Sequence, residues 1–150
     1  ALGLLDPARP VFVESESKKV GNLRVPDALM HAMRASPCID LQLPDDERVG
    51  LLLEDYAYLV NDPTYFCGRL LALTELRGKQ VVAKWVELVQ QCRFADVFRD
   101  LLLTHYDPGY AASIQRNFAQ YGDADQRQLP DRTPAAFEAL ARQLTDLRQA

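Results

Sequence analysis

Two short segments near the N-terminus limit most strongly the folds that this chain can adopt. Val11, Phe12 and Val13 form an apolar run, as expected of a strand buried on both faces. Residues 38–43, CIDLQL, alternate apolar and polar side chains with the period of a strand that has one wetter face. The sequence therefore predicts two strands, at 11–14 and at 38–43.

A helix is predicted between these strands, from about Pro26 to Ala35. A crossover that contains a helix is the usual connection between two parallel strands, and such connections are almost always right-handed. We therefore expect residues 11–14 and 38–43 to be parallel neighbours in one β-α-β unit. Two strands alone leave open edges and bury little, so we expect the unit to be the end of a larger α/β domain.

No segment after residue 44 has the pattern of a strand, and the rest of the chain predicts helices. Apolar residues at helical spacing occur in 45–60, 82–89 and 94–102, and Asp62-Pro63 and Thr133-Pro134 are typical helix starts. Gly78 has the position of a glycine that ends a helix, and 123–132, DADQRQLPDR, reads as a polar loop.

The expected fold class is thus α/β, a partial P-loop-type parallel sheet followed by a mainly α-helical C-terminal region. Residues 1–44 would be the end of a P-loop-like α/β domain, and residues 45–150 a helical region packed on it. The sequence does not indicate the role of the last helix, 133–148.

Composition places the chain among ordinary globular domains. Its 150 residues are 48% hydrophobic and 25% charged, which is enough to build one core. No apolar run approaches the length of a membrane span, and we expect a cytoplasmic protein. The formal net charge of −4 gives no global basic footprint for nucleic acid. Cys38, Cys67 and Cys92 are too far apart for a zinc site or a disulfide framework, so we expect no metal centre.

Polar residues follow the first predicted strand at once. Glu14 ends an apolar run as the acid of a Walker B strand does, where the carboxylate helps to hold a nucleotide's Mg²⁺. Ser15, Ser17, Lys18 and Lys19 offer hydroxyl and ammonium groups within one loop, which could bind a phosphate. The alternative is a solvated loop without a ligand.

Several catalytic motifs are absent from the sequence. Gly78-Lys79 is the only Gly-Lys pair, and it has neither the first glycine nor the hydroxyl of a phosphate-binding loop. The chain also lacks GxSxG and HExxH, and its two histidines stand apart.

A third feature is the segment 104–113, THYDPGYAAS. His105, Tyr106 and Tyr110 flank what reads as an Asp-Pro-Gly turn, and aromatic side chains beside a histidine could stack on unpaired bases. The alternative is a helix end folded back on its own core.

These segments together resemble a known family. The run LDPARPVFVESESKKVGNLRVPDALMHAMR, then ERVGLLLEDY and LLLTHYDPGYAASI, looks like the C-terminal half of bacterial tRNA 2-selenouridine synthase, over residues 5–120. In that family a rhodanese domain is joined to a P-loop domain. The resemblance implies a transferase that converts wobble 2-thiouridine of tRNA to 2-selenouridine, with selenophosphate as donor and an S-geranylated intermediate.

The resemblance also implies what this chain lacks. The family's rhodanese cysteine and Walker A loop lie upstream of the matched region, and none of the three cysteines here matches the catalytic one. We therefore expect a fragment without catalytic residues or a bound cofactor, inactive alone, whose partners are tRNA and the upstream rhodanese and P-loop segments. Selenophosphate and geranyl diphosphate would be the family's substrates.

The resemblance gives the loop after the first strand a role. Its serines and lysines, with Arg24 beyond them, would lie on the side of the missing phosphate loop and bind geranyl diphosphate or the tRNA backbone. Two other functions remain open: a non-enzymatic helical interaction module, and a fragment of a P-loop nucleotide kinase-like protein.

Overall fold

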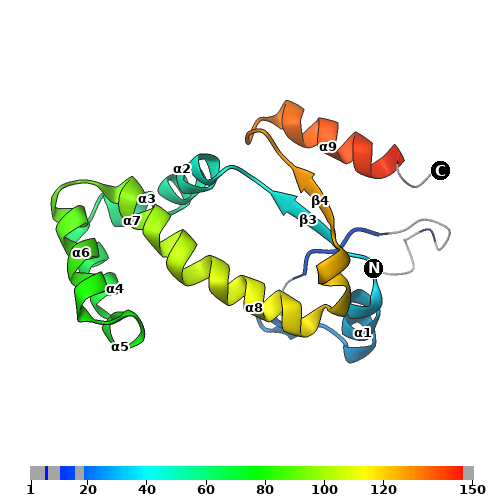
Figure 1. The fold of residues 1–150 in the computed structure, drawn as a ribbon, viewed down its shortest axis with the longest axis horizontal. Helices are drawn as coiled ribbons and strands as arrows, with labels where there is room; N and C mark the ends of the chain where they lie inside the picture. Colours follow the sequence, from blue (N-terminus) through cyan, green and yellow to red (C-terminus); the bar gives the residue numbers. More distant parts are fainter. Residues whose placement is uncertain (1–5, 7–10, 16–18, 147–150) are drawn as a thin grey trace.

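The computed structural model describes residue 6, residues 11–15 and residues 19–146. The chain is mostly helical, and its strands form two small two-stranded sheets (Figure 1). In chain order the elements are β1 Lys19–Val20, β2 Leu23–Arg24, α1 Asp27–Ala35, β3 Ile39–Gln42, α2 Asp45–Asp55, α3 Ala57–Val60, α4 Pro63–Leu71, α5 Thr74–Arg77, α6 Lys79–Gln90, α7 Phe94–Leu101, η2 Leu102–Tyr106, α8 Asp107–Asn117, η3 Ala119–Asp123, β4 Asp125–Gln128 and α9 Pro134–Asp146.

The hydrophobic core lies among the helices that follow residue 44. Trp85 on α6 and Val97 on α7 are completely buried, and Phe66 on α4 stacks on Phe98 with ring centroids 5.4 Å apart. The indole of Trp85 donates to Asp100 Oδ2 at 2.6 Å, so its one polar atom is satisfied inside the core. The amphipathic stripes therefore pack as the sequence predicts.

The predicted helix starts are confirmed. Asp62 caps α4 by accepting a hydrogen bond from the Tyr65 amide at 2.9 Å, with Pro63 in the first turn. Thr133 accepts a bond from the Ala136 amide at the start of α9. Helices α2 to α9 follow residue 44, as the prediction of a mainly helical region requires, and residues 64–104, all of them described, contain no strand.

The larger sheet confirms the α/β class but has an unexpected partner strand. β3 pairs in parallel with β4, in the register Ile39↔Asp125 to Gln42↔Gln128. The prediction that 123–132 is a polar loop is therefore wrong at 125–128. Asp-Gln-Arg-Gln carries no apolar alternation, so only pairing with β3 makes it a strand.

The prediction of a strand at 11–14 is also wrong. Residues 11–15 have no strand conformation, and Val11, Phe12 and Val13 are 52%, 51% and 56% exposed. A strand needs a neighbour to satisfy its backbone groups, and β3 pairs with β4 instead. The β-α-β unit therefore does not form as predicted, although α1 and β3 form where the sequence places them.

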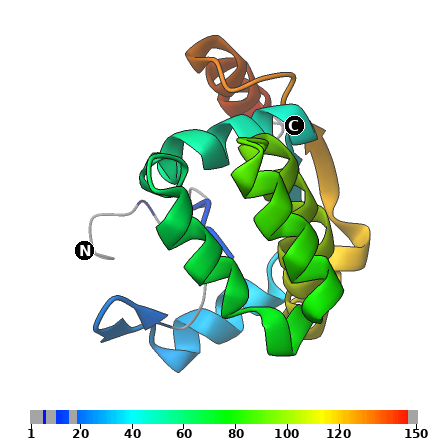
Figure 2. The same cartoon turned by 90° about the vertical axis from the view of Figure 1, so that its left-hand side faces the viewer.

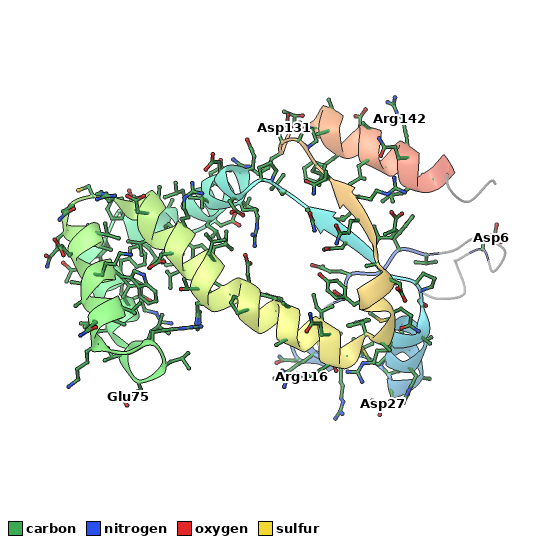
Figure 3. The ribbon with its side chains drawn as sticks, viewed as in Figure 1. Asp6, Asp27, Glu75, Arg116, Asp131 and Arg142 are labelled. Atoms are coloured by element: carbon green, nitrogen blue, oxygen red, sulfur yellow. The ribbon has the colours of Figure 1, made fainter. Side chains whose placement is uncertain are left out.

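Helix α8 connects the helical core to the end of the molecule that holds α1 and the sheets (Figure 1). There η3 packs against α1, and Arg34 Nη2 on α1 donates to Asn117 Oδ1 at 2.7 Å. Helix α9 follows β4 and stands apart from the core, with Asp131 before its start and Arg142 in its second half (Figure 3).

Ion pairs hold α2 to later parts of the chain. Arg48 pairs with Asp107 at the start of α8, through bonds of 2.5 and 3.0 Å. Arg132 lies between β4 and α9. Its Nε donates to Glu47 Oε2 at 3.0 Å, and its Nη1 and Nη2 donate to the two carboxylate oxygens of Glu54. Its guanidinium lies so close to Gly50 that an added Cβ would sit 3.0 Å from Nη2. A glycine at this position therefore leaves room for the pairing.

Candidate functional site

A β-hairpin carries the basic residues that the sequence singles out. Lys19–Val20 and Leu23–Arg24 pair antiparallel around Gly21 and Asn22, and Gly21 has a φ of +59°. A glycine with positive φ at the first turn position is the requirement of a type II′ hairpin. The Gly-Asn pair is thus a hairpin signal in the sequence from which no hairpin was predicted above. We call residues 19–24 the basic hairpin.

The pairing register sets two cations opposite one another. Lys19 and Arg24 are direct partners across the ladder, and both are exposed. With Asn22 and Leu23 they line an open depression of about 330 Å³. An anion bound near both side chains would meet two positive charges at once.

The hairpin projects from the molecule beside α1 (Figure 2). Two cations and one side-chain amide on a protruding turn form an open site rather than an enclosed one. Such a surface suits the phosphate oxygens of a large ligand, because the ligand does not have to enter a cavity.

The other residues predicted near this site are placed differently. Glu14 and Ser15 are exposed, in a segment without regular structure, so Glu14 does not end a strand. The Walker B interpretation is wrong in this respect, since it needs a carboxylate fixed at a strand end. Ser17 and Lys18 lie outside the described residues.

The predicted Asp-Pro-Gly turn does not exist. Residues 94–117 are helical throughout, as α7, a π-helical turn η2 and α8. Within η2 the Asp107 amide bonds to the Leu102 carbonyl, five residues back. Pro108 has no amide hydrogen, and the wider turn before it lets the helix continue through the proline.

His105 lies on this π-helical turn and is held by an arginine. Arg77 Nε donates to His105 Nδ1 at 2.7 Å, and Arg77 Nη2 also lies against the same nitrogen. Burial and the Arg77 charge lower the pKa of His105 below its ordinary value. Because Nδ1 accepts, the proton of the neutral imidazole sits on Nε2.

Tyr106 carries a partly exposed aromatic ring at the end of the π-helical turn. Its ring meets His105 edge to face with centroids 5.0 Å apart, and its pKa is raised by partial burial and by the neighbouring phenols of Tyr56, Tyr110 and Tyr58. Of these tyrosines, Tyr106 and Tyr110 were predicted from the sequence as candidate site residues.

Tyr56 and Tyr58 were missed because nothing local marks them. They lie where α2 passes into α3, in a segment whose apolar spacing predicts only a packed helix. Tyr56 takes part in that packing, with its ring stacked on Phe98 at 6.1 Å. Only the tertiary arrangement places this segment against Phe98 of α7.

The described residues offer neither a metal centre nor a membrane anchor of the helical kind. No group of three or more His, Cys, Asp or Glu side chains that could hold a metal ion occurs among them. None of the helices in the described ranges is long and apolar enough to cross a bilayer.

Comparison with known proteins supports the resemblance noted in the sequence. Residues 4–67 match the family model of the tRNA 2-selenouridine synthase AAA domain. No curated protein and no solved structure matches the chain. The matched residues include the basic hairpin, α1, β3, α2 and α3, together with Tyr56 and Tyr58. Over residues 4–67, less than half of its length, the chain is therefore similar to the AAA domain of tRNA 2-selenouridine synthase.

Proposed function

We propose that this chain is the tRNA-binding, C-terminal portion of an enzyme that replaces the sulfur of wobble 2-thiouridine with selenium. Selenophosphate would be the selenium donor, and the reaction would pass through an S-geranyl intermediate made from geranyl diphosphate. The match of residues 4–67 to the family supports this assignment, and tRNA is the substrate named in the family's description.

The basic hairpin would contribute binding, not chemistry. Lys19 and Arg24 face each other on its two strands, and Asn22 stands between them at the turn. The paired cations are the observation that carries the proposal, because they supply charge-assisted hydrogen bonds to phosphate oxygens. The arginine guanidinium can donate to two phosphate oxygens at once, while the lysine ammonium contributes a point charge.

The chemical steps would be carried out elsewhere in the enzyme. The sequence contains no phosphate-binding loop, and Cys38 and Cys67 are half-buried. We propose that the rhodanese cysteine and the phosphate loop belong to upstream segments of the same protein. The exposed apolar run at residues 11–13 would then be a surface that those segments cover.

The test is tRNA binding by the double variant Lys19→Ala/Arg24→Ala. We expect affinity to fall by about 1–3 kcal/mol, the usual contribution of hydrogen bonds to charged groups. The dependence of log K on log salt should become shallower, because fewer counterions are released. Stability should change little, since both side chains are exposed.

A matched control removes the same charges elsewhere. Lys79 and Arg69 are exposed on α6 and α4, so Lys79→Ala/Arg69→Ala changes the net charge equally but leaves the hairpin intact. If both double variants bind tRNA alike, with equal salt slopes, the basic hairpin has no phosphate-binding role.

A further inference from the structure

Helix α5 is a single turn that contributes no buried side chain to the core. None of the residues Thr74–Arg77 is buried, and Leu76 is 65% exposed. Gly78, directly after the helix, has a φ of +85°, which glycine adopts far more easily than other residues. A segment with few buried contacts can open locally at a low cost in free energy. The position of α5 therefore depends strongly on what holds Arg77, its last residue.

Arg77 is held by a histidine and not by a carboxylate. Its Nε donates to His105 Nδ1 at 2.7 Å, across 28 residues of sequence, and its Nη2 lies against the same nitrogen. The hydroxyl of Thr74 bonds only to the Leu71 carbonyl of the preceding helix. No acid in the described part of the chain forms an ion pair with Arg77. The link from α5 to η2 thus needs an Nδ1 that is free to accept.

Protonation of His105 removes this acceptor. An imidazolium carries a hydrogen on both ring nitrogens, so Nδ1 becomes a donor and faces the N–H groups of the guanidinium. Two positive charges then stand at hydrogen-bond distance, where they repel each other. The contact between Arg77 and His105 is therefore compatible only with the neutral imidazole.

The acids on the helices continuous with η2 have partners of their own. On α7, Asp100 accepts from the indole of Trp85 and lies 3.7 Å from Lys84 Nζ on α6. On α8, Asp107 is bound by Arg48. Neither carboxylate can neutralise a protonated His105 without giving up these bonds.

The electrostatics of His105 give the direction of the pH effect. Burial and then the guanidinium of Arg77 lower the pKa of His105 below its ordinary value of 6.5, while Glu75 on α5 is exposed and the ring of Tyr106 meets the imidazole edge to face. A group with a lowered pKa in the folded state takes up a proton more readily once it is released. The contact therefore stabilises α5 above about pH 6.5, and this stabilisation is lost as the pH falls through the lower pKa of the folded state.

We propose that the contact between Arg77 and His105 is a pH-sensitive latch, which holds α5 against η2 near neutral pH and releases it when His105 is protonated. The inference does not rest on the proposed function, because it uses only contacts within the chain. Release is local, since the buried core consists of residues outside α5. It frees the guanidinium of Arg77 and loosens the turn that ends at Gly78.

The experiment follows amide hydrogen exchange of the full chain at pH 7.5 and at pH 5.5. The amides of Leu76, Arg77 and Gly78 report on α5, because they bond to carbonyls of the same turn. His105→Asn is the matched variant, since its amide oxygen can accept from Arg77 and does not titrate. Comparing wild type with this variant at each pH cancels the intrinsic pH dependence of exchange. On acidification wild type should lose protection relative to the variant, about tenfold for each pKa unit between the latched and released states.

A second variant tests the role of the arginine. Arg77→Met keeps an unbranched side chain but removes the charge and the donors, so the pKa of His105, followed by NMR of the imidazole, should rise. Arg69→Met removes an exposed cation from the neighbouring helix α4 and should leave that pKa as in wild type. The imidazole of His31, on α1, is the internal reference in each titration. Circular dichroism checks that each variant folds.

Three results would overturn the latch. One is a ratio of exchange rates between wild type and His105→Asn that is the same at both pH values. Another is a pKa of His105 that Arg77→Met leaves unchanged. The third is a loss of protection on acidification that extends equally over α6 and α7, because this would indicate unfolding of the core and not release of α5.

Discussion

At the scale of single residues, Cys92 has a backbone conformation that is unfavourable for a residue with a Cβ. It follows α6 with a φ of +58°, the one positive value at a non-glycine position among the described residues. Its amide bonds to the Val89 carbonyl and the next amide, of Arg93, bonds to Leu88. These are the two hydrogen bonds of a Schellman motif, in which glycine normally occupies this position.

Replacing Cys92 with glycine should therefore stabilise the protein. The left-handed conformation costs a residue with a Cβ about 1–2 kcal/mol, and glycine recovers part of this. We expect urea unfolding to show a gain of about 1 kcal/mol. Cys92→Ala is the control, because it removes the thiol and keeps the strain. A glycine variant no more stable than the alanine variant would mean that the conformation carries no measurable strain.

At the scale of elements, the α2–α8 connection depends on a forked ion pair. Arg48 lies in the first turns of α2 and binds Asp107, the first residue of α8, through two nitrogens. The hydrogen bonds to Asp107 are the main reason that the pKa of Arg48 is raised. The pair holds the start of α8 against α2, and Tyr106 and Tyr110 lie at this start.

A double-mutant cycle measures this coupling. Arg48→Ala, Asp107→Ala and the double variant should give an interaction free energy of about 1 kcal/mol, reduced from the value for a buried pair because both side chains are roughly one third exposed. The coupling should decrease as salt increases. A coupling near zero at low salt would show that apolar packing alone sets the start of α8.

At the scale of the whole molecule, the chain has a core but an incomplete sheet. The parallel sheet of β3 and β4 has only two strands. The apolar residues 11–13 are exposed and pair with neither strand. Parallel sheets are normally covered on both faces and contain more strands. The proposal that the chain is one part of a larger enzyme would account for this arrangement.

We accordingly expect the 150-residue chain to be inactive by itself. Incubated with 2-thiouridine tRNA, selenophosphate and geranyl diphosphate, it should give no 2-selenouridine detectable by mass spectrometry of digested tRNA. The same chain joined to segments that carry a reactive cysteine and a phosphate-binding loop is the positive control. Product formed by the chain alone would show that its own residues include the catalytic groups.

The sequence by itself determined the features that depend on neighbouring residues. The starts of α4 and α9 follow from Asp62 and Thr133, whose side chains bond to backbone amides in the next turn. The apolar spacing of 82–89 determined which face of α6 is buried, and the alternation of 38–43 was sufficient to identify β3. The Gly-Asn turn of the basic hairpin was also encoded locally.

Only the tertiary structure decided which distant segments meet. The pairing of β3 with residues 125–128 rests on backbone hydrogen bonds, which any sequence offers and no side-chain pattern marks. The same holds for the helix that continues through Pro108, since a π-helical turn stands where the local sequence indicates an Asp-Pro-Gly turn. Local preference cannot report such contacts, because their free energy comes from groups that come together only when the whole chain is folded.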